Sequence, residues 1–169
     1  MILNSHIQKW KKWKWKLIYK RRDIVFVKIK KLKENAIIPT RGSKSAAGYD
    51  LYACLDNGLM IPPHTTIPVG TGLAMEIPEG YFGAIVARSG IATKRGLRPA
   101  NCIGVIDSDY RGEFIVALHN DTDVAQAIEK NERIAQLVIM KQFSINFIET
   151  DKLSETERNT GGFGSSGKN

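Results

Sequence analysis

The chain from Ile24 onward is a series of short β-type runs, and this pattern limits the fold more than any other feature. Val25, Val27 and Ile29 alternate with other side chains, as in a strand with one buried face. Further runs of strand length follow at Ile67–Val69, Gly72–Ile77, Tyr81–Ala87, Ile103–Ile106, Phe114–His119 and Ile134–Phe143. Turn sequences separate them, at Asp56-Asn57-Gly58, Pro62-Pro63, Pro78-Glu79-Gly80, Arg111-Gly112 and Asn120-Asp121. The pattern predicts an all-β sandwich or barrel. One short helix is expected over Ser89–Arg95, ended by Gly96.

Residues 1–23 differ in charge from the rest and are expected to form a basic, Trp-rich extension. Residues 1–22 hold eight Lys or Arg and no acid, so with a net charge of +8 for the whole chain, residues 23–169 sum to zero. Apolar residues recur at helical spacing between the lysines, at Leu3, Ile7, Trp10, Trp13 and Leu17. Such a segment is a candidate for contact with anionic surfaces, either membrane or nucleic acid, or for a targeting peptide. The alternatives are a tail without a task and a start codon assigned upstream of the true one. Because residues 23–169 carry no net charge, we expect that the core of the protein requires neither nucleic acid nor a membrane.

Cysteine and histidine placement points away from disulfides and structural metals. Cys54 and Cys102 lie 48 residues apart without a CxxC pattern, which predicts neither a disulfide framework nor a zinc site. The three histidines lack metal-ligand spacing, and no apolar run approaches the ~18 residues of a membrane span. A reducing compartment fits, so we expect a cytoplasmic protein, with organellar targeting by the extension left open.

Two internal segments carry polar residues suited to chemistry. Arg88-Ser89-Gly90 stands where a strand gives way to the expected helix, a plausible seat for phosphate, with ordinary capping by Ser89 as the alternative. Gly104–Glu113 is expected to be a hairpin arm ending in an acidic, aromatic turn. There one carboxylate can deprotonate water and Tyr110 can pack on a sugar. The alternative is a surface turn with a salt bridge.

The C-terminal segment Arg158–Gly167 combines an Arg, four glycines, a Phe and two serines. Bare glycine N–H groups and a planar guanidinium suit phosphate oxygens, and an aromatic face suits a base. A disordered, solubilising tail is the alternative. Gly162–Lys168 fits most of a P-loop, but Asn169 stands where Ser or Thr is needed, and no P-loop is expected.

Taken in chain order with two weaker segments, these stretches resemble the five motifs of the trimeric deoxyuridine triphosphatase (dUTPase) family. The five are Ala47–Leu51, Ala87–Gly90, Gly104–Glu113, Glu132–Leu137 and Arg158–Gly167, and the resemblance covers residues 24–167. It implies a jelly-roll-like distorted β-barrel over 24–150 and a flexible Gly-rich tail over 151–169 that closes over the substrate. It also implies a homotrimer whose three active sites are each assembled from all subunits.

The resemblance further implies hydrolysis of dUTP to dUMP and pyrophosphate with Mg²⁺, which lowers dUTP and supplies dUMP for thymidylate synthesis. Asp107 would activate the water, and Tyr110 would pack on the deoxyribose and exclude a ribose. The uracil edge would be read by Asn101, Gly104, Val105, Ile106 and Ile115. Phosphates and the metal-water shell would be held by Arg88, Ser89, Gly90 and Gln136, and the magnesium water shell would be organised by Asp50. The tail contacts would come from Arg158, Phe163, Gly164, Ser165 and Ser166. Asn159 departs from the family, which usually has a small residue there.

Two other functions remain open. A dCTP deaminase shares the fold, but Ala117 stands where that family places its catalytic Glu. A relative with a regulatory binding role, either active or catalytically dead, is the second alternative. A nucleic-acid-binding module would rest on the extension alone.

Overall fold

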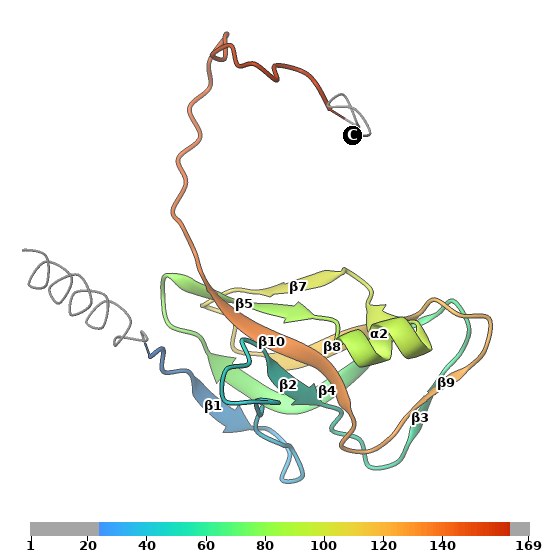
Figure 1. Ribbon diagram of the computed structural model, residues 1–169. Helices are drawn as coiled ribbons and strands as arrows, with labels where there is room; N and C mark the ends of the chain where they lie inside the picture. Colours follow the sequence, from blue (N-terminus) through green and yellow to red (C-terminus); the bar gives the residue numbers. More distant parts are fainter. Residues whose placement is uncertain (1–23, 163–169) are drawn as a thin grey trace, which may run out of the picture.

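The computed structural model of the chain describes residues 24–162 and is shown in Figure 1. Its elements are β1 (Lys28–Lys31), β2 (Tyr49–Tyr52), β3 (Leu59–Ile61), β4 (Thr66–Glu76), β5 (Tyr81–Val86), α2 (Ser89–Arg95), β6 (Leu97–Pro99), β7 (Ile103–Ile106), β8 (Glu113–Asn120), β9 (Gln126–Ile128) and β10 (Arg133–Lys141). Among these residues, no helix is long and apolar enough to cross a membrane. The predicted N-terminal extension lies outside the described residues.

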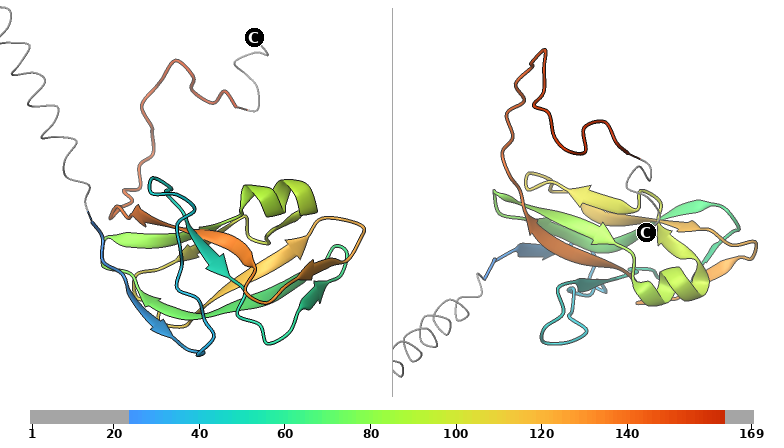
Figure 2. Two further views of the ribbon diagram at one scale, coloured as in Figure 1. Left: turned by 60° about the horizontal axis from the view of Figure 1, so that its bottom comes forward. Right: turned by 45° about the horizontal axis from the view of Figure 1, so that its top comes forward.

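Two four-stranded antiparallel sheets make up the body. One has the strand order β1-β4-β8-β6, the other has the order β2-β10-β5-β7, and β3 and β9 form a separate two-stranded ribbon. Figures 1 and 2 show the sheets stacked on each other, with α2 at one end. Within residues 24–162, the predicted all-β, jelly-roll-like fold with one short helix is confirmed.

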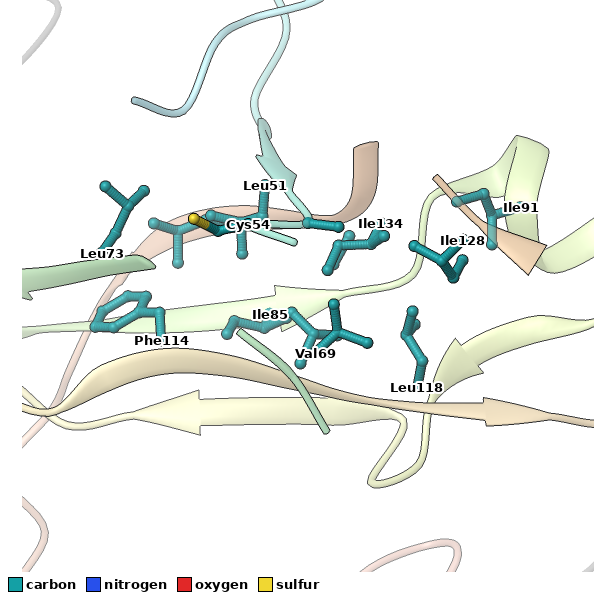
Figure 3. Close-up of a cluster of buried hydrophobic side chains, with 14 of the residues drawn as sticks. Leu51, Cys54, Val69, Leu73, Ile85, Ile91, Phe114, Leu118, Ile128 and Ile134 are labelled. Atoms are coloured by element: carbon teal, nitrogen blue, oxygen red, sulfur yellow. The ribbon is translucent and has the colours of Figure 1, made fainter. Parts of the chain in front are cut away.

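The core lies between the two sheets, and the period-2 pattern of the sequence explains which side chains enter it. Along β8, Phe114, Val116 and Leu118 are buried, while the intervening residues point outward. Figure 3 shows Phe114 and Leu73 near one end of this core and Ile91, from α2, near the other. Truncating one of these side chains to Ala would cost about 2–5 kcal/mol of stability.

Of two local predictions, the one for the short helix is confirmed and the one for two separate strands before residue 78 is corrected. Helix α2 spans Ser89–Arg95 as predicted, and Gly96 ends it in the left-handed conformation with φ 61°. Two of the expected strands are one, because β4 runs continuously from Thr66 to Glu76 with a register shift between Gly70 and Ala74. Gly72 lies in this shift with φ 66°, and a Cβ there would come within 2.7 Å of the Cys54 Sγ. A glycine that looks like a strand break is therefore a bulge.

The hairpin expected over Gly104–Glu113 is wrong in its pairing. Strand β7 pairs with β5, whereas β8 pairs with β4 and β6 in the other sheet. The segment Asp107–Gly112 therefore crosses from one sheet to the other. Alternating side chains predict that a segment is a strand, but they do not identify its neighbour, because either sheet can bury the same face.

Candidate active site

One face of the sheet β2-β10-β5 gathers polar residues from three of the predicted segments. Asp50 on β2 lies directly opposite Gln136 on β10, and Gln136 in turn lies opposite Val86 on β5. Arg88 follows Val86 by two residues, at the entrance to α2. Segments far apart in the sequence thus meet at the carboxylate of Asp50.

The Asp50 carboxylate is buried, with a relative exposure of 2% for the residue, and accepts three hydrogen bonds. Arg88 Nε and Gln136 Nε2 donate to Oδ1 at 2.9 and 3.3 Å, and Arg133 Nη1 donates to Oδ2 at 3.2 Å. Two guanidinium groups therefore compensate one buried charge, which would be costly to leave unpaired. Asp50 holds Arg88 and Gln136 in place, and its predicted contact with a magnesium water shell stays a prediction. No group of three or more His, Cys, Asp or Glu residues in the described part of the chain is placed to hold a metal ion.

Arg133 was not among the residues predicted for the site, and a bulge in β10 explains how it reaches Asp50. Arg133 is opposite Tyr52 and Ala135 is opposite Leu51, so β10 carries one extra residue there. In a regular strand, residues 133 and 136 would point to opposite faces. The bulge puts Arg133 on the same face as Gln136. The sequence signal is the adjacent buried pair Ile134 and Ala135, which breaks the alternation.

The Arg88-Ser89-Gly90 segment is placed at the helix entrance as predicted, but Ser89 does not cap the helix. Arg88 is the N-cap residue, in extended conformation, and makes no side-chain capping hydrogen bond. The alternative of ordinary capping by Ser89 is therefore wrong. Ser89 and Gly90 are exposed in the first turn of α2.

The crossing between the sheets presents Asp107 and Tyr110 at the surface. Asp107 is exposed directly after β7, and its carbonyl accepts a hydrogen bond from the Tyr110 N–H at 3.2 Å. The Tyr110 hydroxyl donates to the Glu113 carbonyl at 3.1 Å, and its ring lies 6.3 Å from that of Phe114. A Cβ at Gly112 would overlap the Tyr110 hydroxyl and ring. Gly112 therefore lets the aromatic ring fold back over the turn.

The residues predicted to read a base edge are divided between the two sheets. The Asn101 side chain packs beside Gly104, at the start of β7. Val105 on β7 is exposed and Ile106 is half-buried. Ile115 is also exposed but belongs to β8 in the other sheet. The structure thus brings Asn101 together with Gly104–Ile106, and it places Ile115 on a strand that does not pair with them.

The C-terminal tail leaves β10 at Gln142 and runs away from both sheets (Figures 1 and 2). Arg158 lies in a compact turn, where its Nε donates to the Gly161 carbonyl at 2.8 Å. Asn159 has φ 42°, and it exchanges hydrogen bonds with Thr156: the Thr156 N–H donates to Asn159 Oδ1 and the Asn159 N–H donates to Thr156 Oγ1, at 3.1 and 3.0 Å. Asn tolerates this left-handed conformation better than most residues, which explains how it fits this position. The predicted tail contacts Phe163, Gly164, Ser165 and Ser166 lie outside the described residues.

Comparison with known proteins gives one consistent result. The family model described as dUTPase matches residues 34–167. The deoxyuridine 5'-triphosphate nucleotidohydrolase of Nautilia profundicola is 49% identical over 142 residues, which cover 84% of this chain and 99% of that protein. Among solved structures, a mutant dUTPase of Staphylococcus bacteriophage 80alpha with dUpNHpp is 30% identical, with a TM-score of 0.77 over 84% of this chain and 98% of the other. A mutant dUTPase from phage phi11 of S. aureus, described with a coordinated structural Mg(II) ion, is 25% identical, with a TM-score of 0.66 over 75% and 97%.

Proposed function

Since the chain belongs to the dUTPase family, we propose that it is a hydrolase that cleaves dUTP to dUMP and pyrophosphate. The observation that carries this is the family match over residues 34–167, which includes every residue of the predicted site from Asp50 to Ser166. The reaction would lower dUTP and supply dUMP for thymidylate synthesis. A cytoplasmic location, in keeping with two free cysteines, belongs to the same proposal.

Asp107 is the proposed general base. Its carboxylate is exposed directly after β7, where it can take a proton from a water that attacks the α-phosphate. Arg88, held by Asp50, and Arg158 on the tail would face the phosphate oxygens, on which negative charge builds up. Tyr110, folded over Gly112, would pack against the deoxyribose.

Mg²⁺ is the proposed metal, and the residues present fit an ion held largely by water and substrate. Mg²⁺ prefers oxygen ligands and keeps several of its waters, so it does not need a dense cage of protein ligands. Three of the roughly four acceptor positions of the Asp50 carboxylate are filled, and Oδ2 retains one. Asp50 is thus suited to a contact through water and not to direct coordination. When bound, the ion would neutralise charge on the triphosphate.

A homotrimer with shared active sites is the proposed assembly. The tail carries exposed apolar side chains at Phe143, Ile145, Phe147 and Ile148, which would be covered by a second copy of the chain. Strand β1 is a sheet edge, open to pairing. A groove of about 520 Å³ runs beside it, lined by residues that include Val25, Val27, Ile29, Leu137 and Ile139. Residues 142–157 can span up to about 50 Å when extended, more than the ~30 Å diameter of a small domain, so Arg158 would be able to reach a neighbouring subunit.

The test of the proposed function is pyrophosphate release from dUTP, dTTP, dCTP and UTP in parallel, with and without Mg²⁺. Release from dUTP alone, dependent on Mg²⁺, is the expected result. Ammonia released from dCTP would point to a deaminase. Binding of nucleotide without turnover of any of them would point to a regulatory relative.

Replacing Gly112 with Ala is expected to reduce discrimination between dUTP and UTP by about tenfold, measured as the ratio of the two kcat/KM values. The added methyl would overlap the Tyr110 ring and displace it from over the turn, and with it the surface proposed to exclude a ribose hydroxyl. Gly42→Ala is the matched control, because a Cβ there has no neighbour within 4 Å. An unchanged ratio in Gly112→Ala would contradict the proposed function of Tyr110.

Deleting residues 1–22 is expected to leave kcat/KM for dUTP within about twofold, or roughly 0.4 kcal/mol. The segment precedes the family match and contains none of the predicted site residues. The full-length protein alone should sediment with acidic lipid vesicles or retard DNA, in a salt-sensitive way. A tenfold loss of activity on deletion would show instead that the segment contributes to the site or the assembly.

A further inference from the structure

Arg88 contacts the Asp50 carboxylate through only one of its nitrogens. Its Nε donates to Oδ1 at 2.9 Å, and its Nη1 donates to the Arg133 carbonyl at 3.2 Å. Within the described residues, Nη2 of Arg88 has no protein acceptor. The Arg88 side chain is only 23% exposed, so this unused donor is held in a defined place.

Another arginine of the chain shows the geometry that Arg88 lacks. Arg98 Nε donates to Asp121 Oδ2 at 2.7 Å, and its Nη2 donates to Oδ1 at 2.9 Å, so the guanidinium closes on both carboxylate oxygens. This pairing holds the pKa of the Asp121 carboxyl below its ordinary value, mainly through the hydrogen bond from Arg98. Two parallel hydrogen bonds are the arrangement that the planar guanidinium favours with a free carboxylate.

The difference lies in the second oxygen of Asp50. Arg133 Nη1 donates to Oδ2 at 3.2 Å, whereas Arg88 and Gln136 both donate to Oδ1, so each carboxylate oxygen has a guanidinium partner of its own. Arg133 reaches it only because the bulge in β10 turns its side chain to the face of Gln136. Asp121 has one guanidinium partner in the part of the chain that the structure describes, and its Oδ1 also lies 3.4 Å from His119 Nε2.

We propose that Arg133 is a positioning residue that keeps Arg88 Nη2 available for a phosphate oxygen of the substrate. By drawing Asp50 Oδ2 toward its own guanidinium, it keeps the carboxylate turned so that Arg88 meets Oδ1 alone. It also leaves a local excess of one positive charge, two guanidinium groups against one carboxylate, where an anion would bind. The inference rests on the proposed function in one respect, namely that Arg88 binds phosphate.

The test compares Arg133→Met with Arg133→Lys, and uses Lys130→Met as the control. Lys130 is an exposed cation three residues before Arg133, so its replacement removes the same charge without touching Asp50. In Arg133→Met we expect KM for dUTP to rise about tenfold while kcat stays within about threefold, since a ground-state phosphate contact is lost. Lysine can still donate to Oδ2, so Arg133→Lys should return KM to within about threefold of wild type. Lys130→Met should match wild type.

A crystal structure of Arg133→Met without nucleotide provides a readout that does not depend on catalysis. Arg88 is expected to close on both Asp50 oxygens, as Arg98 does on Asp121. A variant in which Nη2 stays away from Oδ2, or in which only the melting temperature falls while KM is unchanged, would overturn the inference. Arg133→Ala serves the same purpose if Met is not tolerated. If the wild-type protein fails to cleave dUTP, the proposed function fails, and the structure of the variant still decides the pairing of Arg88.

Discussion

Replacing Asp107 with Asn is expected to lower kcat for dUTP by about 10²–10⁴-fold, the range typical of a positioned acid–base group. The amide keeps the size and shape of the side chain but cannot accept a proton from water. Because Asp107 is exposed and makes no side-chain hydrogen bond within the described residues, the change should not disturb the fold. Binding of a non-hydrolysable dUTP analogue, measured by calorimetry, should stay close to that of the wild-type protein.

Asp109→Asn is the matched control for this prediction. Asp109 lies two residues away in the same crossing, is also exposed, and has no proposed function in the reaction. Its replacement removes the same charge from nearly the same place, so it controls for the loss of charge alone. Because Asp109 has no proposed function in the reaction, kcat should stay within about threefold. Near-wild-type turnover in Asp107→Asn, or an equal loss in both variants, would rule out Asp107 as the base.

Removing residues 151–169 is expected to lower kcat/KM for dUTP by about 10²–10⁴-fold. The deletion takes away the Arg158 guanidinium, whose charge-assisted contact with phosphate would contribute about 1.5–3 kcal/mol, and the Phe163 ring, whose stacking on a base would contribute about 1–3 kcal/mol. Because all the described residues of this segment are outside the body and none belongs to the core, the melting temperature should barely change. A truncated protein with full activity would exclude the tail from the site.

Mixing the Asp107→Asn variant with the protein that lacks residues 151–169 tests whether the active sites are shared between subunits. If Arg158 from one subunit serves Asp107 of another, refolding Asp107→Asn together with the truncated protein should restore part of the activity, because some mixed sites then contain an intact base and an intact tail. Each protein refolded alone supplies the baseline. No recovery in mixtures that light scattering shows to be trimeric would mean that each tail closes over its own subunit.

Local signals in the sequence predicted most of the elements but not their partners. Helix α2 was predicted to the residue because Ser89 follows a strand and Gly96 provides a C-cap. The three-residue strands β3, β6 and β9 were not predicted, since three residues are too short for alternation to be recognised. The assignment of β7 and β8 to different sheets was also beyond the pattern, because strand pairing is decided by tertiary packing.

For the candidate site, too, individual residues were predicted, but a contact that depends on strand pairing was not. Asp50, Arg88 and Gln136 were predicted from their motifs, and the structure joins all three through hydrogen bonds. Arg133 was missed because its distance of three residues from Gln136 assigns it to the opposite face of a regular strand. A bulge depends on the pairing of two strands and leaves only a weak trace in one of them, here the buried pair Ile134 and Ala135.

The extra residue in β10 reconciles the three-residue spacing between Arg133 and Gln136 with their shared face. Deleting Ala135 would remove no charged group and would leave a strand able to pair with β2 and β5. It would also remove the bulge and shorten the spacing to two residues, at which regular alternation keeps Arg133 and Gln136 on the same face. By contrast, the same three-residue spacing in a strand without a bulge would direct the Arg133 guanidinium toward the interior, where an unpaired charge is costly. For chains of this kind, the spacing between Arg133 and Gln136 carries as much information as the two residues themselves.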